Sequence, residues 1–287
     1  MYTYYHNAGR TTSQERDPLY NLERELKIRG FSPQTVKSYL LYNKLFLQFS
    51  KKSPKLITNE DIRQYLLFLK DKNRSSSTLN VVLNALKFYY RQLLKRRFFF
   101  DIKSAKKTNY LPTILSKEEI ERMLLKTTNP KHNFLISLMY SAGLRVSETI
   151  KIRMRDFDLD RRMIMVRQGK GQKDRCTLLS EKLILVLKKQ LLLKKPVDYL
   201  FTGAGGNGHL TTMSAEKIVK KAAESADISK KVSCHSLRHS FATHLLESGT
   251  SIRYIQELLG HKRLETTQIY TKVANNNLKN IKSPLDN

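Results

Sequence analysis

The sequence predicts a mainly α-helical protein with one small β-sheet, divided into two domains. Apolar residues recur at the spacing of amphipathic helices through most of the 287 residues. Only two short neighbouring runs have the composition of strands. A polar, basic segment at residues 103–112 contains a proline and is typical of an exposed connector. We therefore expect a helical domain, a linker and an α+β domain.

The first domain is expected to be all α and to cover residues 18–102. Residues 1–17 are polar and lack apolar periodicity, which predicts a flexible leader. The apolar spacing over residues 19–100 fits four helices. Their predicted starts carry capping residues, which are Ser32 before Pro33, Thr58 with Asp61, and the run at residues 75–78.

The second domain is expected over residues 113–287, including a C-terminal tail. It begins with a capping box formed by Ser116 and Glu119. Two strand-like runs, 163–167 and 176–179, are joined by a turn whose glycines permit positive φ, so we expect a hairpin with a lysine at its tip. A glycine-rich stretch at 203–208 lacks the Gly-Lys-Ser/Thr of a phosphate loop and is predicted to be an ordinary loop.

The charge balance indicates a polyanionic partner. Lysine and arginine number 53 against 25 aspartate and glutamate, a formal charge of +28. These basic residues are spread along the chain instead of flanking one apolar segment, which favours nucleic acid over a membrane surface. Two cysteines, Cys176 and Cys234, are too few for a disulfide framework or a zinc site, and Cys234 is expected in the core. The N-terminal sequence lacks the pattern of a signal peptide, so a cytoplasmic protein is expected.

One predicted helix carries residue types suited to a phosphate. Within residues 235–245, Leu237, Phe241 and Leu245 form a buried stripe, while His235 and Arg238 share another face. An imidazole beside a guanidinium offers a phosphate a proton donor or acceptor together with a bidentate cation. The spacing of a zinc protease motif is present, but a serine occupies the position of its essential glutamate, so no metal site is expected.

The other polar residues of this half each have a plain structural reading. His261 follows a helix-ending glycine and is a candidate C-terminal cap, and Tyr270 is a candidate half-buried aromatic beside Ile269. Arg145 lies in the first turn of a helix, and Glu148 is a candidate to orient it through a salt bridge, which would add little stability if the pair is exposed. His239 and His244 are expected to be packing or solvent-facing residues.

Read in order, five short motifs resemble the active-site signature of the tyrosine site-specific recombinases. They are Gly143-Leu144-Arg145, Gly169-Lys170-Gly171, His235-Ser236-Leu237-Arg238-His239, Leu259-Gly260-His261 and Tyr270. The helical region at 19–100 also resembles the core-binding, SAM-like domain of that family. The resemblance covers nearly the whole chain and implies a two-domain architecture with a helical core-binding domain and an α+β catalytic domain.

The resemblance also implies a role for each matched residue. Arg145 and Arg238 would hold the non-bridging oxygens of the scissile phosphate, and His261 would be a further donor to it. Lys170 would protonate the leaving 5′ oxygen, with Lys173 as the alternative if the turn is registered differently. His235 would handle the proton of the tyrosine. Tyr270 would be the nucleophile that forms a 3′-phosphotyrosine, without ATP, metal or other cofactor.

The leading hypothesis is a recombinase of the Xer type that resolves chromosome or plasmid dimers. It would act as a homotetramer on two double-stranded DNA sites and exchange a C-terminal segment at 278–285 between subunits. The need for a second recombinase or an accessory protein stays open. An integrase of a mobile element is the close alternative, although the leader is far below the size of an additional arm-binding domain. A type IB topoisomerase and an inactive DNA-binding protein are the remaining alternatives.

Overall fold

The structure is a computed structural model of the whole chain. It describes residues 19–96, 102–106, 111–167, 174–203, 205–206, 208–261 and 263–271. The expected leader, Lys170 and Lys173 of the hairpin turn, and the tail at 278–285 lie outside the described residues. The chain forms two compact units, residues 1–109 and 110–287. None of the helices described is both long and apolar enough to cross a membrane.

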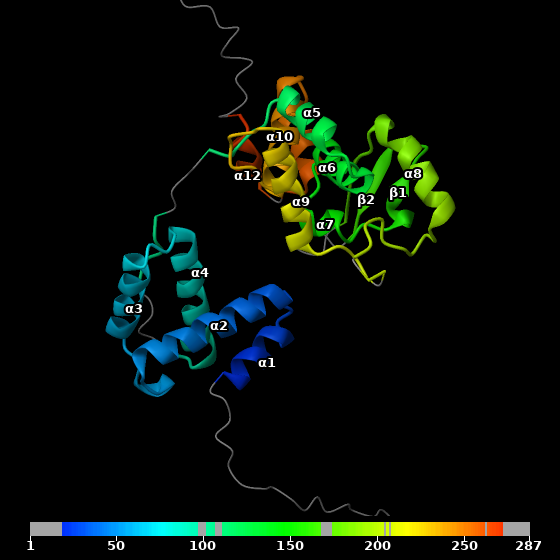
Figure 1. Cartoon of the computed structure of the whole chain (residues 1–287). Helices are drawn as coiled ribbons and strands as arrows, with labels where there is room; N and C mark the ends of the chain where they lie inside the picture. The colour runs from blue at the N-terminus through cyan, green and yellow to red at the C-terminus, as the bar shows by residue number, and fades with distance from the viewer. Residues whose placement is uncertain are drawn as a thin grey trace, which may run out of the picture. The chain divides into compact units, whose positions relative to one another are not determined.

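The first unit contains the four α-helices that the sequence predicts. They are α1 (Tyr20–Ile28), α2 (Pro33–Ser50), α3 (Asn59–Asp71) and α4 (Ser76–Lys87), with a 3-10 turn η1 (Pro54–Leu56) before α3 and a π-helical turn η2 (Phe88–Leu93) after α4 (Figure 1). The predicted caps are confirmed: the side chains of Ser32, Thr58 and Ser75 each accept a backbone N–H of the first turn. Asp61 completes the capping box with Thr58.

The core of this unit contains one polar side chain with a clear structural role. The apolar core is formed by residues from all four helices, including Leu22, Leu26, Phe46, Ile62, Tyr65, Val82, Leu86 and Tyr90. Asn43 of α2 is fully buried among them, and its Nδ2 donates to the carbonyl oxygens of Tyr39 at 2.9 Å and Ala85 at 3.1 Å. The bond to Ala85 ties α2 to α4, and the bond to Tyr39 lies within α2.

The last described segment of the first unit, residues 102–106, is fixed against α4. Asn80 of α4 donates to the carbonyl of Ala105 at 3.0 Å and accepts from its N–H at 2.8 Å, while Lys87 donates to the carbonyl of Ile102 at 2.8 Å. The first residues of the expected linker therefore pack against α4. The boundary between the units falls after Asn109, and the domain bounds drawn from sequence stay a prediction.

The second unit is mostly helical with one small sheet, which confirms the predicted fold class. Its longer helices are α5 (Lys117–Lys126), α6 (Pro130–Ala142), α8 (Glu181–Leu193), α9 (Thr212–Ser225), α10 (Cys234–Glu247) and α11 (Ile252–Leu259). Three short elements are α7 (Val146–Thr149), the 3-10 turn η4 (Met154–Asp156) and α12 (Glu265–Gln268). The capping box of Ser116 and Glu119 starts α5 as expected.

The sheet contains the predicted hairpin and one further strand. β1 (Phe157–Asp158), β2 (Met163–Val166) and β3 (Arg175–Leu178) are antiparallel in the order β1-β2-β3. Val166 faces Arg175 in the register, so Arg175 is the first paired residue after the turn that carries Lys170.

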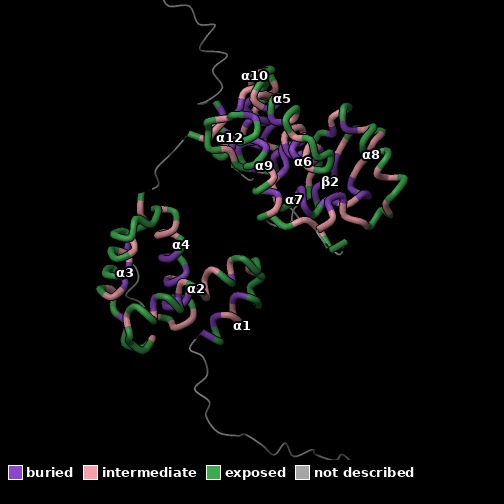
Figure 2. Tube along the Cα trace, viewed as in Figure 1, coloured by how far each residue is buried: buried purple, intermediate pink, exposed green. Residues whose placement is uncertain are grey.

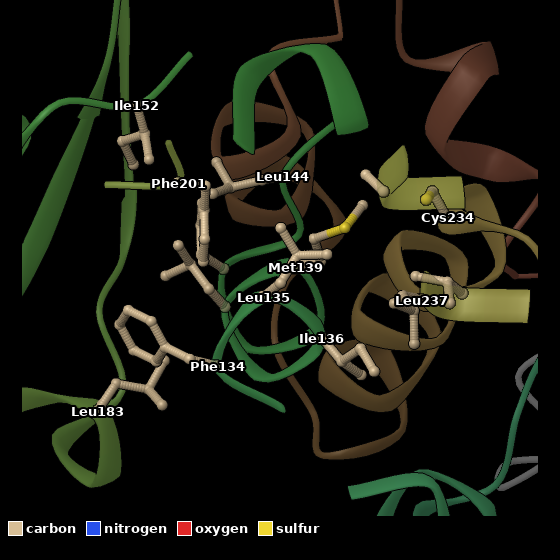
Figure 3. Packing of buried hydrophobic residues seen from close by; sticks show 14 of the residues in the cluster. Phe134, Leu135, Ile136, Met139, Leu144, Ile152, Leu183, Phe201, Cys234 and Leu237 are labelled. Atoms are coloured by element: carbon tan, nitrogen blue, oxygen red, sulfur yellow. The ribbon is translucent and has the colours of Figure 1, made fainter. Parts of the chain in front are cut away.

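Helix α6 is the centre of the second unit. It runs between α9 and α10 on one side and the sheet with α8 on the other (Figure 1). Its apolar residues are distributed around the helix, as expected of a helix surrounded by protein. Figure 3 shows Phe134, Leu135, Ile136 and Met139 of α6 packed with residues of other elements, among them Leu144, Ile152, Leu183, Phe201, Cys234 and Leu237. Cys234 is buried there as the sequence predicts, and burial raises the pKa of its thiol to about 12.

A second, smaller core lies beside this one. It is formed by Phe241 and Ala242 of α10, Ile255 and Leu259 of α11, and Tyr270. In the second unit, buried residues are concentrated where the helices face one another (Figure 2). The small core holds α10, α11 and the segment after α12 together, which are the elements that carry most of the predicted site.

Candidate active site

Five of the six predicted site residues line one pocket of about 530 Å³ in the second unit. The pocket lies at the start of α7, along α10, at the end of α11 and beside α12. Its lining is Arg145, His235, Arg238, His239, Gly260, His261, Arg263, Thr266, Ile269 and Tyr270. The sixth residue, Lys170, lies outside the described residues, as does its alternative Lys173.

The backbone that delivers Arg145 depends on a glycine. Gly143 ends α6 with a φ of +59°, and a Cβ at this position would lie 2.3 Å from the ring of Phe241. Only a residue without a side chain permits this close approach of α6 to α10. The chain turns there, and Arg145 becomes the N-cap of α7.

Glu148 is a buried anchor, so its salt bridge to Arg145 is not an exposed pair. Its carboxylate accepts from the backbone N–H and from Nη1 of Arg145, both at 2.8 Å. Arg175 donates to the same carboxylate with both terminal nitrogens, at 2.8 and 2.7 Å. Burial alone would raise the pKa of Glu148, but the hydrogen bonds and charge of Arg175 and the bonds from Arg145 lower this pKa to about 2. Glu148 is therefore ionised at neutral pH and fixes both arginines.

Arg238 is the most deeply buried cation of the pocket. Its side chain is 2% exposed, and it donates to the carbonyl oxygens of Gly143 and Leu259, each at 2.6 Å. Burial and the nearby charge of Arg145 lower the pKa of Arg238 to about 9. Three guanidinium groups, those of Arg145, Arg175 and Arg238, thus lie around the single carboxylate of Glu148, and this excess positive charge favours binding of an anion.

His261 is placed by a second glycine. Gly260 ends α11 with a φ of +62°, and a Cβ there would lie 2.7 Å from Cδ of Arg175. Arg238 donates to Nε2 of His261 at 3.2 Å, so the ring proton resides on Nδ1 and faces Oγ1 of Thr267 at 3.0 Å. Burial, followed by the charges of Arg238, Arg145 and Arg175, lowers the pKa of His261 to about 3. The ring is neutral, and donation from Nε2 to a phosphate requires the other tautomer.

Tyr270 is buried and bonded to a histidine that the sequence analysis assigned to packing or solvent. The residue is 1% exposed, in contrast to the half-buried aromatic expected. Its phenol oxygen lies 3.1 Å from Nδ1 of His239. Burial raises the pKa of Tyr270, and the charges of Arg238 and Arg145 act in the opposite direction. Those two arginines are therefore close enough to act on the phenol electrostatically.

His235 lies at the edge of the same pocket. It is an exposed residue, and its ring centroid is 5.4 Å from that of His239, one helical turn further along α10. Burial of part of the ring and the charges of Arg238 and Arg145 lower the pKa of His235. Among the described residues, the phenol of Tyr270 is hydrogen-bonded to Nδ1 of His239 and not to His235.

Sequence reasoning missed three features of this site: Arg175, the burial of Glu148 and the contact made by His239. A signal for His239 existed, because it follows His235 by four residues and therefore lies on the same face of α10. Arg175 had no comparable signal, since it is 27 residues from Glu148 in the sequence and meets it only in the folded unit.

Comparison with models of known protein families shows which family the chain belongs to. Residues 113–277 match the model described as "Phage integrase family", and residues 19–98 match "Phage integrase, N-terminal SAM-like domain". The chain belongs to the phage integrase family of tyrosine recombinases. Enzymes of this family cleave and rejoin DNA through a phosphotyrosine intermediate, so the predicted family, architecture and enzyme class are confirmed.

Relatives of this tyrosine recombinase match over most of its length. A protein of Sinorhizobium fredii described as an integrase/recombinase is 36% identical over 268 residues, which are 92% of this chain and 87% of the relative. The tyrosine recombinase XerA of Thermococcus kodakarensis is 35% identical over 91% of this chain and 93% of its own. The crystal structure of the XerH site-specific recombinase bound to a palindromic difH substrate is 26% identical, with a TM-score of 0.70 over 91% of this chain and 82% of that one.

Proposed function

We propose that this chain is a site-specific recombinase that attacks a DNA phosphodiester with the phenol of Tyr270. One observation carries the proposal: Tyr270 lines the same pocket as Arg145 and Arg238, and the charges of both arginines act on its phenol. A nucleophile beside two cations is the arrangement required for attack on a negatively charged phosphate.

In the proposed mechanism, the two arginines hold the non-bridging oxygens of the scissile phosphate. A guanidinium has five N–H donors. Arg238 uses three of them on Gly143, Leu259 and His261 among the described residues, which leaves two for phosphate oxygens. Arg145 is held by Glu148 through Nη1, and the residue lines the pocket. Hydrogen bonds hold both cations in the absence of DNA, so we expect little reorganisation as charge develops.

The other predicted site residues complete the proposal. His261 would donate to the phosphate once its ring proton is on Nε2, and His235 would contact the phosphate from the pocket edge. Lys170 would protonate the leaving 5′ oxygen. Reversal of the attack by the 5′ hydroxyl of a partner strand would release Tyr270 and join the new strands, with no ATP and no metal.

A nicked duplex that carries the cognate site tests this function. Loss of the short fragment downstream of the cleavage site prevents religation, so the wild-type chain should accumulate a covalent DNA adduct. Tyr270→Phe should bind the same DNA and form no adduct. Tyr254→Phe is the matched control, because Tyr254 is an exposed tyrosine on α11 outside the pocket. An undiminished adduct from Tyr270→Phe would refute the assignment.

Within the family, we propose the Xer type, acting as a homotetramer on two DNA sites. The support is the match to XerA and XerD relatives of similar length, and the recombinase–DNA complexes among similar structures. Sequencing the DNA that remains attached to Tyr270 tests this directly. A chromosomal or plasmid dimer-resolution site supports the Xer type, whereas the ends of a mobile element support the integrase alternative.

A further inference from the structure

Helix α10 presents two histidines to tyrosine phenols, and only one of the pairs lies in the pocket. Nδ1 of His239 lies 3.1 Å from the phenol oxygen of Tyr270, with ring centroids 5.6 Å apart. Nδ1 of His244 lies 2.8 Å from the phenol oxygen of Tyr140, with ring centroids 5.8 Å apart. The first pair lines the pocket and the second does not.

We propose that His239 is the group that accepts the phenol proton of Tyr270 during strand cleavage. The inference rests on the proposed function and adds a catalytic residue to it. It assigns the proton transfer to a residue other than His235, to which family resemblance gave that role. The geometry is the reason, because the phenol oxygen of Tyr270 lies within hydrogen-bonding distance of Nδ1 of His239, which can accept the phenol proton.

The proton balance of this step is simple. The phenol oxygen forms a bond to phosphorus, its O–H bond breaks, and the proton moves to Nδ1 of His239. The P–O5′ bond breaks with its electron pair on the 5′ oxygen, which takes a proton from the general acid proposed at Lys170. With its own ring proton on Nε2, neutral His239 has a free lone pair on Nδ1 for this transfer.

The surroundings keep His239 unprotonated and fixed. The side chain is half-buried on α10, against His235 on one side and Tyr270 on the other. Burial and the proximity of His235 and Arg238 lower the pKa of His239 to about 4. The ring is therefore unprotonated at neutral pH, and a pKa this low makes it a weak base before DNA binds. A bound phosphate anion would raise its basicity as the phenol becomes more acidic on bonding to phosphorus.

Single-turnover cleavage of the nicked site tests this role. His239→Gln retains a hydrogen-bonding group but cannot accept a proton, so we expect cleavage to slow by about 100-fold or more. His244→Gln is the matched control because it removes the other histidine–tyrosine bond of α10, and its rate should stay within about threefold of wild type. Circular dichroism and DNA binding by gel shift establish that both variants fold and bind.

Two further measurements separate proton transfer from a purely structural role. Added imidazole should partly restore cleavage by His239→Ala, because it can enter the open pocket and take the same proton. A substrate with sulfur in place of the bridging 5′ oxygen has a leaving group that needs no acid, so the His239→Gln defect should persist on it. Absence of imidazole recovery, recovery in His235→Ala instead, or full activity of His239→Gln on the sulfur substrate would each overturn the inference.

The outcomes for the inference and for the proposed function are distinct. An adduct formed by Tyr270→Phe would refute the proposed function itself. Loss of the adduct in Tyr270→Phe together with wild-type cleavage by His239→Gln would leave the function standing and remove His239 from it.

Discussion

Replacing Glu148 with glutamine removes the charge that fixes Arg145 and Arg175 while preserving the shape of the side chain. The pKa of Glu148 falls from 4.5 to about 2 in the folded protein. Since one pKa unit corresponds to about 1.4 kcal/mol, ionisation of this buried carboxyl stabilises the fold by on the order of 3 kcal/mol at neutral pH. Removal of one partner from a buried ion pair costs a similar amount, about 3 to 5 kcal/mol.

The pH dependence of the stability loss in Glu148→Gln distinguishes loss of the carboxylate charge from loss of packing. The folded pKa lies below the unfolded value, so the stabilisation is fully present above the unfolded pKa and is lost as the pH falls through the folded pKa. The difference between wild type and Glu148→Gln should shrink to roughly 1.4 kcal/mol at about pH 3 by the same relation. Urea unfolding followed by far-ultraviolet circular dichroism measures this difference in unfolding free energy. The relevant unfolding transition is the one whose midpoint changes in Glu148→Gln.

The same substitution at an exposed position provides the control. Glu181 pairs with Arg162, and their side chains are 69% and 58% exposed. Glu181→Gln should change the free energy of unfolding by less than about 0.5 kcal/mol at either pH. A Glu148→Gln penalty that is the same at neutral pH and about pH 3 would refute the electrostatic reasoning, and so would a penalty no larger than that of Glu181→Gln.

Three further predictions concern a glycine, a buried asparagine and a buried arginine. Gly143→Ala should destabilise the fold by about 2 to 4 kcal/mol in urea unfolding, because the added Cβ would overlap Phe241. Gly249 also has a positive φ but has open space around it, so Gly249→Ala should cost only about 1 to 2 kcal/mol. Asn43→Ala should cost about 1 to 3 kcal/mol in urea unfolding by losing the bond to Ala85 of α4 and the bond to Tyr39 within α2. Equal stability of this variant would contradict the role of Asn43. Arg238→Lys should lower the cleavage rate on the order of 100-fold, while a gel shift should show that DNA binding is retained. The same change at the exposed Arg253 should have no effect on cleavage. Equal losses of cleavage in both variants would argue against a specific phosphate contact by Arg238.

Local signals in the sequence were sufficient for most of the fold. The helix starts at Ser32, Thr58, Ser75 and Ser116 follow from capping chemistry, which involves only residues within one turn. The β2–β3 hairpin follows from a local turn, and the structure shows it with one additional short strand, β1. The motifs that suggested the family also consist of neighbouring residues.

The site required information that neighbouring residues do not contain. Sequence motifs named Arg145, His235, Arg238, His261 and Tyr270, but their meeting in one pocket depends on α6, α10 and α11 packing together. The sequence indicates a helix-ending glycine before His261, but the contacts that exclude a Cβ at Gly143 and Gly260 are visible only in the structure: an aromatic ring in one case and an arginine side chain in the other.

The sequence by itself determined the helical character, the basic charge and the set of residues suited to phosphate chemistry. Only the tertiary structure decided that Glu148 is a buried anchor for Arg175 and that His239 contacts the phenol of Tyr270. The physical reason is the distance along the sequence over which each interaction acts. Helix periodicity and capping act over a few neighbouring residues, whereas burial, pKa shifts and hydrogen bonds between elements depend on side chains that are 27 and 31 positions apart in these two cases.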